Sequence, residues 1–196
     1  SILCVSDLHL GKTHRLNRIG AGALPPYENI DTLKRLQEDI HNTNPSCVIC
    51  LGDSFDDPLA ERSLSTNEID SLKILQKGRE WIWISGNHDP YISSKYGNYF
   101  NSFSKSAITF RHIALRGENG EISGHYHPKI SVKLSNATVV RACFIADQNK
   151  IIMPAYGTYT GGMSVRSDEI KELVDPDAIV MLTGKKIRAI PYSSCF

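Results

Sequence analysis

The chain of 196 residues lacks the extremes of composition that mark several classes of protein. Its net charge is only +1, so it carries no overall basic coat for nucleic acid, and such a partner would need a local patch. No apolar run approaches the roughly 18 residues that span a bilayer. With 41% hydrophobic and 22% charged residues, the chain can bury a core. We therefore expect a single domain over residues 1–196, neither disordered nor a coiled coil.

The five cysteines do not form a recognisable metal or disulfide framework. Cys47 and Cys50 make a C-x-x-C sequence, but no second C-x-x-C follows, which argues against a zinc knuckle. We expect these side chains to be small buried thiols in a reducing compartment. The apolar start of the chain runs straight into polar Ser6 and Asp7, unlike a signal peptide, so we predict a cytoplasmic protein without a membrane anchor.

Apolar periodicity predicts alternating strands and helices in the first half of the chain. Strands are expected at residues 2–5, 47–51 and 81–84, with a helix at residues 31–41. A second helix should begin after Ser65, whose spacing to Glu68 is that of a capping box, and end near Gly78. Residues 6–28 and 53–63 are expected to be loops. Strands that alternate with helices favour a parallel sheet with helices on both faces.

The second half of the chain shows short apolar runs separated by turn residues. Strands are predicted at residues 108–115, 121–123, 131–134, 139–145, 151–153, 178–182 and 187–190, and a short helix at residues 168–174. Taking the two halves together, we expect an α/β fold in which two mixed β-sheets pack as a sandwich with helices outside, in four layers.

Clusters of polar residues follow the predicted strands. They are Asp7-Leu8-His9, Gly52-Asp53-Ser54-Phe55-Asp56, Gly86-Asn87-His88-Asp89, Arg111-His112 and Gly124-His125-Tyr126-His127. Each alone is compatible with a turn, but the set falls where open α/β sheets bind ligands. The mixture of nitrogen and oxygen ligands suits Mn, Fe or Zn better than Mg or Ca. Two such metals ~3.5–4 Å apart are a known arrangement for phosphoester hydrolysis.

These motifs resemble those of the calcineurin-like metallophosphoesterase superfamily. Further segments are similar to the bacterial ligase-associated group, which is described as a DNA damage response endonuclease or phosphodiesterase; they are Asp7-Leu8-His9-Leu10-Gly11-Lys12, Leu24-Pro25-Pro26-Tyr27, Trp81-Ile82-Trp83-Ile84, Gly124-His125-Tyr126-His127-Pro128 and Tyr159-Thr160-Gly161-Gly162. The resemblance implies the metallophosphoesterase fold, two divalent metal ions with Mn²⁺ favoured over Fe or Zn, and DNA as the substrate. It also implies functional association with a DNA ligase, a helicase and a nuclease.

The resemblance assigns a role to each matching residue. It gives Asp7, His9 and His127 to the first metal, Asn87, His112 and His125 to the second metal, and Asp53 to a bridge between them. It makes His88 the acid that protonates the leaving oxygen and Asp56 the residue that orients His88. Two features depart from the ligase-associated pattern. Members often have histidine at the position of Asp56, and they usually carry a segment before the first strand, which implies that a short N-terminal segment is missing here.

A short basic run follows the first polar cluster. Lys12, His14, Arg15 and Arg18 are predicted to contact the phosphates of a polyanion, with a solvated loop as the alternative. Three other functions stay open: a phosphodiesterase or phosphatase for small nucleotides, cleavage of RNA, and a metal-free scaffold that binds protein partners. The complete ligand set argues against the scaffold.

Overall fold

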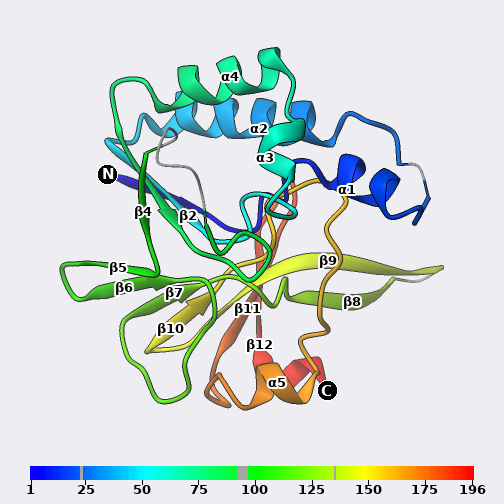
Figure 1. Ribbon diagram of the computed structural model, residues 1–196. Coiled ribbons are helices and arrows are strands. Elements are labelled where there is room, and N and C mark those ends of the chain that lie inside the picture. The colour runs from blue at the N-terminus through cyan, green and yellow to red at the C-terminus, as the bar shows by residue number, and fades with distance from the viewer. Residues whose placement is uncertain (23, 92–96, 135) are drawn as a thin grey trace.

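The computed structural model describes residues 1–22, 24–91, 97–134 and 136–196. Two β-sheets pack face to face, with helices outside each of them (Figure 1). None of the helices in the described ranges has the length and apolar character needed to cross a bilayer.

The first sheet is parallel throughout and has the order β1-β2-β3-β4. Its strands are β1 (Ile2–Val5), β2 (Cys47–Leu51), β3 (Glu80–Ile84) and β4 (Asn98–Phe100). Helices α2 (Glu28–Thr43) and α4 (Thr66–Gln76) lie side by side over one face, whereas the second sheet lies against the other (Figure 1). Helices thus cover one face only, in contrast to the expectation of helices on both, because the second sheet replaces one helical layer.

The second sheet is mixed and has the order β12-β11-β9-β10-β7-β6-β5, with β8 paired to β9. Its strands are β5 (Ser102–Lys105), β6 (Ile108–Arg111), β7 (Glu121–Ser123), β8 (Lys129–Leu134), β9 (Ala137–Ala146), β10 (Lys150–Ile152), β11 (Ile179–Leu182) and β12 (Arg188–Pro191). A short helix, α5 (Asp168–Lys171), and a C-terminal 3₁₀ helix (Tyr192–Cys195) pack outside this sheet (Figure 1).

Alternating side chains of the central strands divide the core into layers. Val48 of β2 and Trp83 of β3 pack with helix residues such as Leu36. Their neighbours Ile49 and Ile84 point the other way and pack against the second sheet. A third cluster joins the second sheet to α5 and the C-terminal turn. The predicted sandwich with outer helices is confirmed, and it places the carboxyl ends of β1, β2 and β3 beside loops of the second sheet.

Two short helices and two short strands fall outside the sequence-based expectations. Helix α1 (Lys12–Arg18) buries only Thr13 and has no side-chain cap, so it carries neither an apolar stripe nor a start signal. Helix α3 (Ala60–Ser63) is a single turn. Strands β4 (Asn-Tyr-Phe) and β5 (Ser-Phe-Ser-Lys) were not predicted because they are too short to show an apolar pattern. By contrast, the capping box at Ser65 is present, with the Glu68 carboxylate accepting from the Ser65 N–H at 2.7 Å.

Candidate metal centre and active site

The predicted ligands lie on loops that leave both sheets. Asp7, His9, Asp53 and Asn87 follow strands of the first sheet, whereas His112, His125 and His127 follow strands of the second. Eight non-glycine residues of the described chain have positive φ, and five of these are Asp7, His9, Asp53, His125 and His127. Such backbone strain persists only where the surrounding structure enforces it, and it concentrates at functional sites.

A first group of ligand atoms comes from Asp7, His9 and His127, which bring them within 4.8 Å of one another. Oδ1 of Asp7 and the Nε2 atoms of both histidines are buried and have no hydrogen-bond partner among the described residues. His127 Nε2 is 2.9 Å from Asp7 Oδ1, yet the two are not aligned for a hydrogen bond. Buried polar atoms without partners are costly. A cation among these three atoms would satisfy all of them, so the group fits a metal.

A second group surrounds Nε2 of His112. This nitrogen lies 3.4 Å from Asp53 Oδ2, 3.0 Å from Asn87 Oδ1 and 3.2 Å from His125 Nδ1. The other ring nitrogen, Nδ1, donates to the carbonyl of Leu51 at 2.8 Å. That bond fixes the ring and, in the neutral imidazole, leaves the lone pair on Nε2. The second group therefore offers two nitrogens and two oxygens to one point, a ligand set that suits a transition metal.

The two groups adjoin each other. Nδ1 of His112 is 3.9 Å from Asp7 Oδ1, an atom of the first group. The position of the His112 ring depends on Gly52, because a Cβ atom at residue 52 would lie 2.6 Å from that ring. Gly52 also has a φ of 80°, which glycine adopts without strain. Glycine at position 52 therefore leaves room for the imidazole of His112, which belongs to the second group.

Charges within the site shift the pKa values of its groups. Burial alone would raise the pKa of Asp53, but the hydrogen bond and charge of His112 outweigh it and lower the pKa to about 2. Burial alone would lower the pKa of His112, but Asp53 and Asp7 outweigh it and raise the pKa. Burial and the nearby His112 lower the pKa of His125. The carboxylates thus favour a positive charge at the second group, whether it is a proton or a metal ion.

His88 lies beside the ligands, and its contacts differ from those expected. Its Nδ1 is hydrogen-bonded to the main-chain carbonyl of Asp56 at 3.0 Å, and its backbone N–H donates to Asp53 Oδ1 at 2.8 Å. The ring centroids of His88 and His9 are 5.2 Å apart. The contact that orients His88 therefore comes from the backbone of Asp56.

The Asp56 carboxylate instead supports a ligand. Its Oδ1 accepts from Nδ1 of His9 at 2.8 Å, which leaves Nε2 of His9 facing the first group. This is the carboxylate–histidine arrangement that commonly orients metal ligands. Burial alone would raise the pKa of Asp56, but bonds from His9 and Arg15 outweigh it and hold the pKa well below its usual range.

The basic residues of α1 face carboxylates. Arg15 forms an ion pair with Asp56, Lys12 lies 3.5 Å from the same carboxylate, and Arg18 pairs with Asp57. Lys12, Arg15 and Arg18 therefore do not form a strip of unpaired cations. These ion pairs could not be predicted from the sequence, because Asp56 and Asp57 are about forty residues away along the chain.

Comparison with known proteins identifies the family. The model of the calcineurin-like phosphoesterase family matches residues 1–180. The chain belongs to this family. It is therefore a hydrolase of phosphoester bonds, and the ligand groups above are candidates for the divalent metals that the family uses.

A solved structure shows the same fold. The crystal structure of Pseudomonas putida nuclease MPE superposes with a TM-score of 0.72 over 96% of this chain and 87% of that one, at 21% sequence identity. Similarity at that identity establishes the architecture alone. No curated protein sequence matches this chain.

Asp89 shapes the candidate site, a role that the sequence motifs did not indicate. Its carboxylate accepts from four backbone N–H groups, those of Gly86, Asp53, Ser54 and Phe55, at 2.7–3.0 Å. Burial is the main cause that raises the pKa of Asp89 to about 7, against the lowering by its N–H donors. Asp89 thereby ties the loop that carries Asp53 to the loop that carries Asn87. In the sequence, only its position directly after His88 indicated that Asp89 belongs to this region.

A buried ion cluster holds the segment that carries His112. Glu121 is 2% exposed and Lys150 is 5% exposed. Glu121 accepts from the Leu115 N–H at 3.2 Å, and Lys150 donates to the Leu115 carbonyl at 2.7 Å. Nε of Arg111 is 3.1 Å from the Glu121 carboxylate. The chain is thus held immediately before His112 and three residues after it.

Replacing Glu121 by alanine is expected to lower the free energy of unfolding by about 3 kcal/mol, because Lys150 would be left buried without its carboxylate. Urea denaturation followed by circular dichroism measures this change. Exposed Glu118, in the loop before β7, serves as the matched control, and Glu118→Ala should change stability by less than about 0.5 kcal/mol. Equal effects of the two substitutions would show that the buried cluster does not hold this segment.

Proposed function

We propose that this chain is a binuclear metal-dependent phosphodiesterase that cleaves DNA, with Mn²⁺ as its metal. The observation that carries the proposal is the pair of adjoining ligand groups, in which Asp53 and Asp7 face histidines from the other sheet. The similarity to a nuclease supports DNA as the substrate. The resemblance to the ligase-associated group further supports a cytoplasmic role in repair beside a ligase, a helicase and a nuclease.

Each residue has a distinct task in this proposal. Asp7, His9 and His127 would hold one ion, Asn87, His112 and His125 would hold the other, and Asp53 would be shared between the two sets. Two bound divalent ions would supply an activated water and neutralise the charge that develops on the phosphate. Asp56 keeps the ring of His9 in place through the bond between its carboxylate and Nδ1.

His88 is the proposed general acid. The Asp56 carbonyl can only accept a hydrogen bond, so Nδ1 of His88 keeps its proton. The proton passed to the leaving oxygen is then the one on Nε2, and the ring must be in its protonated form before the reaction. The bond from the His88 backbone to Asp53 fixes this residue relative to the proposed bridge.

The proposal is tested by comparing substrates with and without metal. Metal-free protein and protein supplied with Mn²⁺ are assayed on an aryl phosphodiester, an aryl phosphomonoester, single-stranded DNA, duplex DNA and RNA. We expect Mn²⁺-dependent cleavage of the diester and of DNA, with the monoester at least about tenfold slower in kcat/KM. Full activity after chelation would contradict the metal dependence. A preference for the monoester, or cleavage of the aryl diester without cleavage of DNA, would replace the proposal with a small-nucleotide phosphatase or phosphodiesterase. A preference for RNA over DNA would replace DNA by RNA as the substrate.

A further inference from the structure

A groove with both polar and apolar walls opens beside the second ligand group. It has a volume of about 370 Å³, and Asn87 and His112 form part of its wall. Beyond these two residues it is lined mainly by Asn101, Ser102, Arg111 and Ile113. A volume of this size admits a ligand of roughly one nucleotide. The groove therefore extends the candidate metal centre in one direction along the surface.

The charge of the groove favours an anion. Arg111 contributes a guanidinium, and no carboxylate is among the described residues that line the groove. Nε of Arg111 lies 3.1 Å from the Glu121 carboxylate without a hydrogen bond, and that carboxylate is also 3.9 Å from Nζ of Lys150. The cluster of two cations and one carboxylate therefore remains positive. The planar guanidinium can bind an oxyanion through two of its N–H groups.

The other lining groups suit the remainder of a nucleotide. Asn101 and Ser102 are exposed and neutral, and they offer hydrogen-bond donors and acceptors. Ile113 is 42% exposed and gives the groove an apolar side. By contrast, the basic side chains of α1 are already paired with Asp56 and Asp57. Arg111 is the cation that lines the groove shared with Asn87 and His112.

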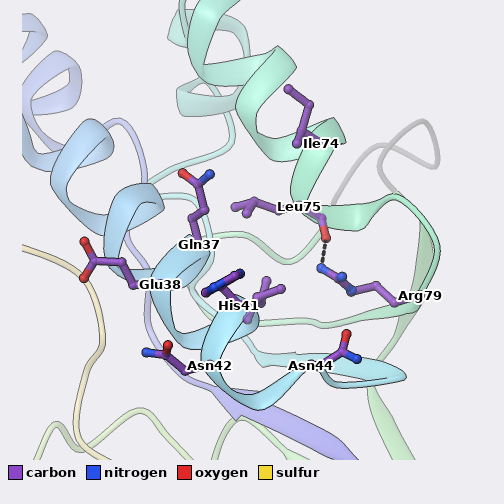
Figure 2. A pocket seen from close by; sticks show the side chains of 9 residues that line it. Gln37, Glu38, His41, Asn42, Asn44, Ile74, Leu75 and Arg79 are labelled. Atoms are coloured by element: carbon purple, nitrogen blue, oxygen red, sulfur yellow. Dashed lines mark hydrogen bonds between the residues drawn. The ribbon is translucent and has the colours of Figure 1, made fainter.

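Another hollow, larger in volume, does not compete for this role. It measures about 770 Å³ and lies between α2 and α4, with Arg79 and His41 among its lining residues (Figure 2). Both helices pack on the face of the first sheet that points away from the second sheet, whereas the ligand groups lie where the two sheets meet. Arg79 donates to the carbonyl of Leu75 at 2.7 Å and is partly buried, as Arg111 is. It therefore provides a matched arginine for comparison.

We propose that the groove at Arg111 binds the phosphate next to the scissile phosphodiester in a nucleic acid strand. The inference rests on the proposed phosphodiesterase function. It further specifies that the bound nucleic acid strand runs from the metal centre toward Arg111. A strand with one phosphate at the metal centre brings an adjacent nucleotide to the groove that shares Asn87 and His112. Arg111 then distinguishes a polynucleotide from a substrate that has a single phosphate.

The test uses small substrates that differ by one phosphate. They are thymidine 5′-(aryl phosphate) with a 3′-hydroxyl or a 3′-phosphate, and thymidine 3′-(aryl phosphate) with a 5′-hydroxyl or a 5′-phosphate. In one of these pairs, the second phosphate should raise kcat/KM about tenfold, the size expected for a charge-assisted hydrogen bond at a partly exposed site. Arg111→Met should reduce this gain to twofold or less, and Arg79→Met should retain it.

A binding measurement separates this inference from the proposed function. Thymidine 3′,5′-bisphosphate is titrated into the Mn²⁺-loaded protein by calorimetry, which needs no turnover. We expect about tenfold weaker binding to Arg111→Met than to Arg79→Met. If Arg111→Met does not fold, Asn101→Asp places a carboxylate in the groove and should weaken binding by repulsion. Equal binding by the two arginine variants, or a phosphate gain that survives Arg111→Met, overturns the inference. If none of the four esters is hydrolysed but bisphosphate binding still depends on Arg111, the proposed function is overturned and the inference about the groove stands.

Discussion

Asp53→Ala is expected to lower kcat/KM for an aryl phosphodiester by about four orders of magnitude, or about 5.5 kcal/mol of transition-state stabilisation. The carboxylate is 2% exposed and has two tasks. Oδ2 faces Nε2 of His112 at 3.4 Å, and Oδ1 accepts the backbone N–H of His88 at 2.8 Å. Removal of this side chain therefore takes away the proposed bridge between the metals and the contact that positions the proposed acid.

Metal content distinguishes loss of the bridge from general damage. The wild-type protein should bind two equivalents of Mn²⁺, whereas Asp53→Ala should bind fewer, as measured by elemental analysis after equilibrium dialysis. Asp70 on α4 is an exposed carboxylate that pairs with Lys73, so Asp70→Ala is the matched control and should keep both metals and full activity. If Asp53→Ala keeps two metals and more than a tenth of its activity, Asp53 is not the bridge.

His88→Ala is expected to retain both metals and to slow turnover by about 10²–10⁴, the range for loss of a general acid. His88 belongs to neither proposed ligand set, and its ring is held through the Asp56 carbonyl. The loss should be largest for DNA, because its alkoxide leaving group needs a proton. It should be smallest for an activated aryl ester, whose leaving group departs readily without one.

The dependence on the leaving group is the informative part of the His88 experiment. A series of aryl diesters with leaving groups of rising pKa should show a steeper fall of rate for His88→Ala than for the wild-type protein. His14 on α1 is an exposed histidine outside the ligand groups, and His14→Ala should follow the wild-type slope. Parallel slopes for His88→Ala and the wild type would remove His88 from the role of acid.

The polar clusters at the strand ends explain why much of the candidate site could be predicted from the sequence. In a parallel sheet, the carboxyl ends of neighbouring strands share one edge, so residues such as Asp7, Asp53 and Asn87 were expected to meet. Short apolar runs also predicted most strands of the second sheet. The partition of the ligands between two metals came from the resemblance to a family, since spacing alone does not show which histidine faces which carboxylate.

Other features depended on contacts that no local pattern encodes. All five residues of β2 are buried, and this gives the same apolar run whether a helix or a second sheet covers the strand. The sequence therefore did not reveal that a sheet replaces one helical layer. Likewise, the Asp56 carboxylate reaches His9 and Arg15, both more than forty residues earlier, so its contact with the candidate metal ligand His9 is seen only in the tertiary structure.

The division of the ligands between the two sheets has a consequence for folding. Asp7 and His9 come from the first sheet and His127 from the second, so an ion bound by all three would cross-link the two halves of the sandwich. Neither half alone presents the complete set, and separation of the halves would release the ion. Conformational stability then becomes coupled to the free metal concentration and gains about 2.7 kcal/mol when that concentration is a hundred times the Kd. In a metal-poor cell the same chain would have a shorter lifetime against proteolysis, which links its abundance to metal supply.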